Sequence, residues 1–215
     1  MKLSANNLNN SKLLTHICQG GKLLFMKRFL VILVLIFSFQ IPSFADDIRD
    51  FQIGGMSIGD SALDYFSEEE IKNGARYDYP KSKKFTDIEI IQLPQFKEYH
   101  SVHINFKTND KNYKIYALDA TILFEENIKD CYKKKDEIVE DVSEILTGAK
   151  KRDAGTSKHP YDKSGQSTTT DVHFNFKSGV VSVSCYDWST KMGYADHLRI
   201  RILTEEFDKF LDTAF

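Results

Sequence analysis

The chain has 215 residues, of which 41% are hydrophobic and 28% are charged, so it can build the core of one domain or of two small fused units. Its 29 basic and 31 acidic side chains give a net charge of −2, and such a chain has no overall attraction for phosphate. Nonspecific nucleic-acid binding is therefore excluded as a function.

Residues 26–45 have the pattern of a secretory signal peptide. Met26-Lys27-Arg28 is a charged start, residues 29–39 form an apolar run in which Ser38 is the one polar residue, and Ser43-Phe44-Ala45 is a small-x-small cleavage site. The run is too short and wrongly flanked for a permanent membrane helix, so we expect no membrane span after cleavage. A retained N-terminal anchor is the alternative. The signal predicts a periplasmic or secreted protein.

Residues 1–25 precede this signal, although a signal peptide should begin near the initiator. They show no clear periodicity, and Gly20-Gly21-Lys22 can be encoded by a purine-rich string that resembles a ribosome-binding site. We therefore interpret residues 1–25 as a mis-called upstream segment, with translation starting at Met26. Residues 46–215 are then expected to form a single α+β domain.

Cleavage after Ala45 changes the charge and leaves two cysteines. It removes five basic residues and no acidic one, which leaves 24 basic and 31 acidic side chains and a net charge of −7. The remaining cysteines, Cys131 and Cys185, would lie in a compartment where disulfides persist.

Three parts of the mature chain have helical patterns. Ser57-Ile58-Gly59-Asp60 has the form of a capping box ahead of a short apolar stripe, and Ser67 begins a second helical piece. Residues 127–146 carry apolar side chains at intervals of three and four, which is typical of one buried side of a long surface helix. Thr204 caps a predicted terminal helix over residues 204–213.

Alternating or β-branched segments predict strands, and a tight turn at Ser178-Gly179 joins two of them. These segments are residues 85–93, 102–107, 113–124, 170–177, 181–185 and 198–202. Residues 149–169 are rich in Lys, Ser, Gly and Thr and are interpreted as a solvated loop, a functional loop being the alternative. The pattern predicts an antiparallel sheet with helices packed on one face.

Two segments seventy residues apart are nearly identical. Residues 102–107 (VHINFK) and 172–177 (VHFNFK) match at five of six positions, and the same offset aligns residues 58–60 with 128–130. One hypothesis is a duplication of a helix-meander unit, with repeats at 56–124 and 126–203. The other is convergent strand composition.

The cysteine pair fits a helix packed on a sheet. Cys131 lies in the apolar stripe of the 127–146 helix, and Cys185 lies on the inward phase of a strand. Packing the helix on that face would bring them together, so we predict a Cys131–Cys185 disulfide; two unpaired core cysteines are the alternative.

The outward phase of the same strands predicts a binding face. If Cys185 points inward, aromatic and cationic residues point outward, and Arg, Tyr and Trp are the residues that dominate interaction hot spots. The candidate binding residues are Tyr186, Trp188, His173, Arg199, Arg201 and His103. Alternatively, Trp188 tucks under the following loop. The expected partner is a protein or an anionic ligand of the bacterial envelope.

Other sites are weaker. Ser61 lies in an Ile-Gly-Asp-Ser-Ala segment that resembles the nucleophile block of GDSL/SGNH hydrolases, with residues 108–110 and His197 as possible partners. That fold needs parallel βαβ units, and Tyr194 stands where the family has an Asp. The histidines of the mature chain have no ligand-like spacing, so we predict neither a metal site nor a cofactor.

Two resemblances complete the sequence evidence. Residues 51–71 (FQIGGMSIGDSALDYFSEEEI), Cys131 and residues 185–188 (CYDW) together resemble an uncharacterised family of small exported alphaproteobacterial proteins, which implies no known activity. More distantly, Gly55-Met56-Ser57 leading into a short helix and a meander is similar to the BamE/SmpA and β-lactamase-inhibitor architecture. Those modules act by protein contact in the envelope, but the usual lipidated cysteine is missing here.

We therefore expect an exported, non-enzymatic interaction module that binds its partner on the open sheet face. The alternatives are a GDSL-like serine hydrolase that uses Ser61 and a small-ligand carrier with a cavity between helix and sheet.

Overall fold

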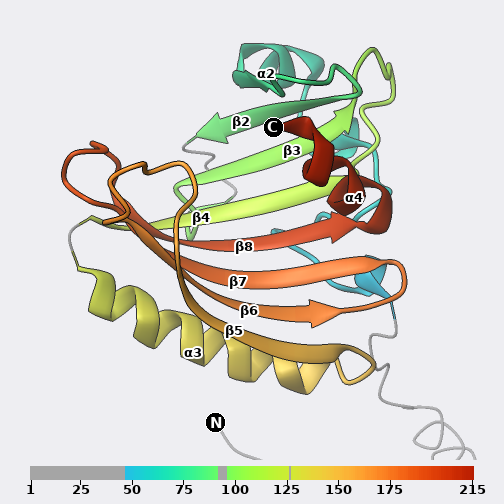
Figure 1. Ribbon diagram of the computed structural model, residues 1–215. Coiled ribbons are helices and arrows are strands. Elements are labelled where there is room, and N and C mark those ends of the chain that lie inside the picture. The colour runs from blue at the N-terminus through green and yellow to red at the C-terminus, as the bar shows by residue number, and fades with distance from the viewer. Residues whose placement is uncertain (1–46, 92–95, 126) are drawn as a thin grey trace, which may run out of the picture. The chain divides into compact units, whose positions relative to one another are not determined.

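The computed structural model describes residues 47–91, 96–125 and 127–215, so the predicted signal peptide and upstream segment lie outside the described residues. Within these ranges a single sheet contains eight strands in the order β1-β2-β3-β4-β8-β7-β6-β5 (Figure 1). Every neighbouring pair is antiparallel. The predicted α+β class with an antiparallel sheet is confirmed.

The strands are β1 (Ala75–Asp78), β2 (Phe85–Ile91), β3 (Ser101–Lys107), β4 (Ala117–Glu125), β5 (Lys150–Lys158), β6 (Thr168–Asn175), β7 (Gly179–Asp187) and β8 (Asp196–Thr204). The helices are α2 (Glu68–Asn73), α3 (Ile128–Ile145) and α4 (Glu205–Ala214), and the single 3-10 turns are η1 (Ile48–Asp50) and η2 (Ala62–Asp64).

The sheet consists of two four-stranded meanders that meet at β4 and β8. Each meander follows helical structure, and the predicted duplication stays a hypothesis. However, the matching segments 102–107 and 172–177 fall on β3 and β6, which are the third strand of one meander and the second of the other. The six-residue match therefore does not join equivalent strands.

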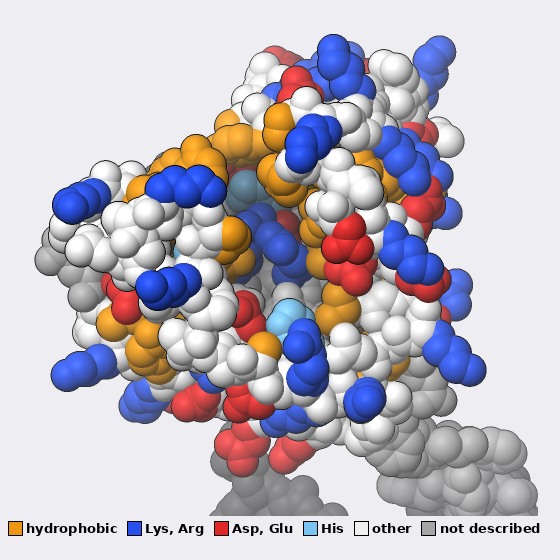
Figure 2. All heavy atoms as spheres, in the orientation of Figure 1, with side chains coloured by type: hydrophobic (Ala, Val, Ile, Leu, Met, Phe, Trp, Pro, Cys, Tyr) orange, Lys and Arg blue, Asp and Glu red, His pale blue; other side chains and the backbone are white. Residues whose placement is uncertain are grey.

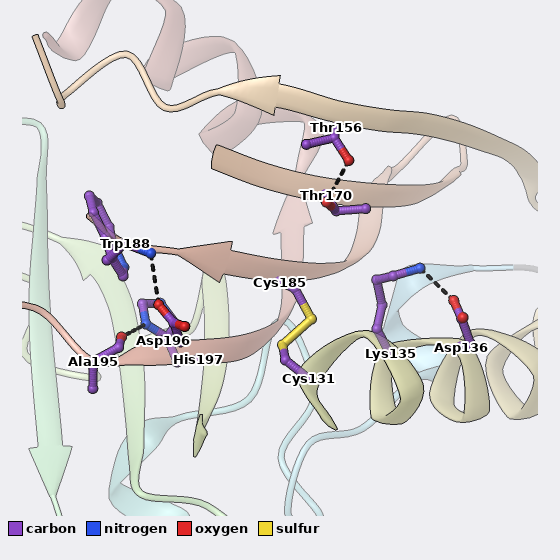
Figure 3. The surroundings of a disulfide bond; sticks show 10 residues. All are labelled: Cys131, Lys135, Asp136, Thr156, Thr170, Cys185, Trp188, Ala195, Asp196 and His197. Carbon is purple, nitrogen blue, oxygen red and sulfur yellow. Dashed lines mark hydrogen bonds and ion pairs between the residues drawn. A yellow bond between two sulfur atoms is a disulfide. The ribbon is translucent and has the colours of Figure 1, made fainter. Parts of the chain in front are cut away.

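Helix α3 packs on one face of the sheet and is tied to it by the predicted disulfide. Cys131 in α3 and Cys185 in β7 are bonded, with 6.0 Å between their Cα atoms, and both are fully buried (Figure 3). Val139 and Val142 of α3 are buried in the same hydrophobic core as Val183 of β7. The apolar stripe is thus used as the sequence predicts.

The segment before α2 packs into the same core but does not form the predicted helix at Ser57–Asp60. There, only the short turn η2 forms, with Ser61 as its cap. The amide groups of Gly59 and Ala62 donate to the carbonyl oxygens of Ile115 and Tyr113 rather than to their own segment. Tertiary hydrogen bonds therefore replace the helical ones.

The predicted solvated loop at residues 149–169 is also wrong. Residues 150–158 form β5, which pairs with β6 at the edge of the sheet. Eight of its nine residues are exposed, so the strand has no apolar alternation that could be detected in the sequence. Lysines at such an edge discourage pairing with another chain.

The terminal helix α4 lies on the opposite face from α3 (Figure 1), an exception to the predicted placement of helices. Thr204 caps it as expected, accepting a hydrogen bond from the Phe207 amide. Phe207 and Phe210 pack against Phe85 of β2, with ring centroids 5.0 and 4.9 Å apart. This helix covers one end of its face, and we call the remainder of that face the open sheet face.

Candidate binding face

The open sheet face is hollowed. Seen from the side of α4, basic and histidine side chains lie at the floor of the hollow and hydrophobic side chains line its walls (Figure 2). The charged groups at the floor come from β2, β3, β4 and β8, and we call them the charged cluster: Asp87, Glu89, His103, Asp119, Arg199 and Arg201.

Sheet register places these charges in a row. Glu89 of β2 is the Cα partner of His103 of β3, which in turn faces Asp119 of β4. Asp119 faces Arg201 of β8. The row alternates in sign from strand to strand, and opposite charges directly across an antiparallel pair stabilise it.

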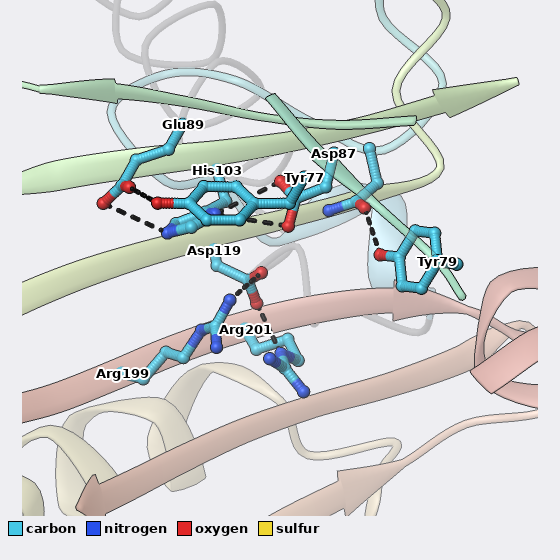
Figure 4. Close-up of polar contacts among 9 residues, drawn as sticks. Tyr77, Tyr79, Asp87, Glu89, His103, Asp119, Arg199 and Arg201 are labelled. Carbon is cyan, nitrogen blue, oxygen red and sulfur yellow. Dashed lines mark hydrogen bonds and ion pairs between the residues drawn. The ribbon is translucent and has the colours of Figure 1, made fainter. Parts of the chain in front are cut away.

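Asp119 is the centre of the row. Its side chain is 3% exposed and accepts hydrogen bonds from Arg199 Nη2 at 2.8 Å and from Arg201 Nε at 2.5 Å (Figure 4). Burial by itself would raise the pKa of the Asp119 carboxyl, but the two guanidinium groups outweigh it and lower that pKa. The two arginines are therefore held by a buried counter-ion rather than free.

His103 is held in the same way between two carboxylates. Its Nδ1 lies 3.2 Å from Asp87 Oδ1 and its Nε2 lies 3.3 Å from Glu89 Oε1 (Figure 4). Burial opposes the charged imidazole, but the bonds to Asp87 and Glu89 raise the pKa of His103 to about 9. The bond from His103 in turn lowers the pKa of Glu89 to about 2. The Tyr77 hydroxyl also donates to Glu89, at 2.8 Å.

The charged cluster is thus electrically balanced at neutral pH. Three cationic groups, with His103 protonated, face three carboxylates. The sequence analysis predicts a cationic surface because it places Arg199, Arg201 and the histidines on one face without the carboxylates of the neighbouring strands.

An aromatic cluster adjoins the charged one, at the end of β7, the start of β8 and the loops that follow β5 and β7. Its members are His159, Tyr186, Trp188, Tyr194 and His197. Tyr186 and His197 stack with ring centroids 4.6 Å apart, and Trp188 packs on His159 at 4.4 Å and on Tyr194 at 4.9 Å. Trp188 is half-buried, and Tyr194 of the following loop packs edge-on against it.

The histidines of the aromatic cluster are uncharged. Burial lowers the pKa of His197 to about 4 and also lowers the pKa of His159. His197 Nδ1 lies 3.0 Å from the Ala195 carbonyl oxygen, so in the neutral ring this nitrogen carries the proton and donates it.

Two loops that carry these rings are bonded to each other. Asp162, in the loop after β5, accepts hydrogen bonds from the Ser167 amide at 2.9 Å and from the Ser189 hydroxyl at 3.1 Å. Ser189 belongs to the loop between β7 and β8. The wall formed by the two loops is therefore fixed by its own polar contacts.

Two adjoining hollows of about 400 Å³ each lie on this face, and they share Tyr77, His103 and Arg199. One, which we call the α4 hollow, runs under α4 and includes Asp119 and Arg201. The other, the aromatic hollow, is lined by Tyr77, Glu89, His100, Ser101, His103, Thr121, Leu123, Tyr161, Trp188, Tyr194, Ala195, His197 and Arg199.

The predicted binding residues are divided by this geometry. His103 and Arg199 line both hollows, Trp188 lines the aromatic one and Arg201 the α4 one. Tyr186 lies behind His197 in the stack, and His173 of β6 faces Ser182, outside either lining. The sequence analysis missed the exposed rings of the rim, Tyr77, Tyr161 and Tyr194.

Buried polar atoms without a hydrogen-bond partner gather at the aromatic hollow. Across the described residues these are Ser101 Oγ, Trp188 Nε1 and Arg199 Nε, and all three residues line it. The Ser101 hydroxyl is near enough to Glu89 to help lower its pKa, but it makes no hydrogen bond of ordinary length. Such an unmet donor costs about 1–3 kcal/mol.

Ser61 and His197, the proposed hydrolase pair, belong to separate hydrogen-bond networks. The Ser61 hydroxyl donates to the Asn112 carbonyl oxygen at 2.6 Å and accepts from the Leu63 amide. His197 is engaged by Ala195 and stacked on Tyr186. In the described part of the chain, no group of three or more His, Cys, Asp or Glu side chains is arranged to hold a metal ion.

Comparisons of this chain with protein-family models, with curated proteins and with solved structures found no match. The two resemblances drawn from the sequence therefore stay predictions. Of the helices in residues 47–91, 96–125 and 127–215, none is long and apolar enough to cross a membrane.

Proposed function

We propose that this protein is an exported, non-enzymatic binding module that holds its partner on the open sheet face. The observation that carries this proposal is the aromatic hollow, a concave site with exposed rings at its rim and unmet hydrogen-bond donors in its lining. Concave sites with a few convergent polar groups are typical of ligand binding.

The chemistry of the lining supports recognition rather than catalysis. His103 is fixed as a cation by two carboxylates, and the low pKa of His197 leaves it a weak base at neutral pH. A general base works best when its pKa lies near the operating pH. The Ser61 alternative lacks a histidine partner in its network.

The setting of the site also supports export. A disulfide between Cys131 and Cys185 is compatible with an extracytoplasmic location, where such bonds persist. The disulfide joins α3 to β7, the strand that leads into Trp188. It therefore stiffens the part of the sheet that carries the binding face.

For the small-ligand carrier, the alternative function, we propose a site on the open sheet face rather than between helix and sheet. The space between α3 and the sheet is filled by packed side chains, among them Val139, Val142 and Val183. Any small ligand is therefore assigned to the open face.

Capture from an envelope extract of the source cells tests the proposal. The oxidised protein is immobilised as wild type, as a Tyr161→Ala/Tyr194→Ala variant and as a Leu63→Ala control. The two tyrosines are 66% and 54% exposed at the rim, and Leu63 is 41% exposed in η2, outside either lining, so all three proteins should fold. We expect the rim variant alone to lose a captured component; equal capture by all three proteins would refute a role for this face.

A further inference from the structure

We infer that the aromatic hollow binds a neutral saccharide, with a sugar ring stacked on the rim aromatics and its hydroxyl groups bonded to the polar lining. This inference rests on the proposed function and names the ligand class for the same site. Its volume of about 400 Å³ is at the lower end of the usual range for small-molecule sites, so it suits a mono- or disaccharide unit.

The rim offers faces for stacking. Tyr77, Tyr161 and Tyr194 are 50%, 66% and 54% exposed and come from β1 and from two different loops. A sugar ring has an apolar face of C–H groups surrounded by hydroxyls, which matches an aromatic ring with a polar end. Tyr77 also bonds to Glu89 and Tyr194 packs against Trp188, but each of the three rings keeps about half of its surface exposed for stacking.

The lining offers hydrogen bonds of both kinds. Trp188 Nε1–H and Arg199 Nε–H can only donate, and both are unpaired. The Glu89 carboxylate already accepts from Tyr77 and interacts with His103, but two carboxylate oxygens have about four acceptor sites in all. Sugar hydroxyls both donate and accept, so one ring can meet these groups together, whereas a purely apolar ligand would leave the donors unmet.

The electrostatics favour a neutral ligand. The charges cancel within the charged cluster as a whole, in which Asp119 is shared by Arg199 and Arg201 and His103 is shared by Asp87 and Glu89. A charged ligand would therefore lose its hydration without gaining an uncompensated counter-charge in the lining. The sequence predicts a protein or an anionic ligand as the partner, and we narrow this expectation to an uncharged ligand.

Binding requires the rim to move. The three unmet atoms are shielded from solvent, and Tyr194 packs edge-on against Trp188 at 4.9 Å in the loop between β7 and β8. Displacement of the exposed Tyr194 ring would open the approach to the Trp188 N–H. Trp188 is the only tryptophan of the chain, so a change in tryptophan fluorescence reports on the surroundings of this side chain.

The test is a fluorescence titration of the oxidised protein with neutral disaccharides: maltose, cellobiose, laminaribiose and N,N′-diacetylchitobiose. A matched disaccharide that carries a uronic acid and the amide of N-acetyltyrosine complete the panel. We expect a saturable change in Trp188 emission with at least one neutral sugar and weaker binding of its acidic counterpart.

Two variants and one control locate the site. Arg199→Lys keeps a cation beside Asp119 but removes the Nε–H, and Tyr161→Ala removes a stacking ring that is 66% exposed and is not the ring that must be displaced. We expect each to weaken the neutral sugar about tenfold, as loss of one hydrogen bond or contact of about 1.4 kcal/mol would. Leu63→Ala should bind as the wild type does.

Each other outcome overturns the inference. No response to any neutral sugar rejects the saccharide, as does tighter binding of the acidic disaccharide or a response to the tyrosine amide alone. If the rim variant still loses its captured component in the extract experiment, the proposed function survives and only the ligand class falls. If both experiments fail, the open sheet face is not a binding site.

Discussion

Removal of the Cys131–Cys185 disulfide should lower the stability of the fold by about 4 kcal/mol. The two cysteines are separated by 54 residues, and a chain-entropy estimate for closing a loop of that length gives about 4 kcal/mol at 25 °C. Both residues are fully buried, so the Cys131→Ala/Cys185→Ala variant also loses some packing. The expected loss is therefore a little larger in the variant than in the reduced wild type.

Urea unfolding of the oxidised wild type, the wild type with a thiol reductant and the double variant measures this loss. With a slope of about 2 kcal/mol/M, the transition midpoint should fall by about 2 M in the reduced wild type. The reductant should not change the double variant, which is the control. Equal midpoints for oxidised and reduced wild type would refute the reasoning, because the loop closure would then contribute nothing.

Four further changes test the rest of the structure. With its pKa raised to about 9, His103 contributes stability that is complete below pH 6.5 and is lost as the pH rises through 9. Urea unfolding of the wild type should show this loss as roughly 3 kcal/mol, and His103→Gln should not show it. Asp119→Asn should cost roughly 3–5 kcal/mol because it leaves two guanidinium groups without their counter-ion, whereas Glu68→Gln, in an exposed pair, should leave the urea midpoint almost unchanged; similar midpoints for the two variants would contradict this. Phe207→Ala should cost about 3–5 kcal/mol by calorimetry, and an unchanged melting temperature would show that α4 is not anchored by this ring. Gly179→Ala should impair folding, seen as lost circular dichroism or soluble yield, because φ is +153° and the new Cβ would lie 2.0 Å from a carbonyl oxygen of β8.

The sequence predicts those parts of the fold whose burial has a regular period. The apolar stripe in α3 carries Cys131, and the inward phase of β7 carries Cys185 together with Val181 and Val183, so their disulfide follows from these two patterns. In β8, buried and partly exposed residues alternate regularly. The outward position of Arg199 and Arg201 follows from the same alternation.

The parts that could not be predicted are those that depend on pairing between distant segments. β5 is an exposed edge strand, so its sequence looks like a loop until β6 pairs with it. Ser57–Asp60 satisfies a helix-start pattern, but its neighbouring amides bond to residues 113–115 instead. Short local patterns are overridden in this way when tertiary hydrogen bonds compete.

The charge of the candidate site could not be predicted from the sequence for the same reason. The spacing of Asp87 and Glu89 shows that they lie on the same face of β2, but it does not show which strand lies next to β2. Only the register shows that both carboxylates meet His103 and that Asp119 meets the arginines. A prediction of charge from one strand therefore overestimates the positive potential of the sheet.

The seam between the two meanders also has a consequence for how the chain folds. β4 has β3 on one side, but its other partner, β8, is the last strand of the sequence, and the ion pair between Asp119 and Arg199 joins residues eighty positions apart. During synthesis the first meander must exist with an open hydrogen-bonding edge until almost all of the polypeptide has emerged. Contacts this distant in sequence slow folding and favour completion after release from the ribosome. The pairing of β4 with β8 at the centre of the sheet is therefore the last strand pairing to form.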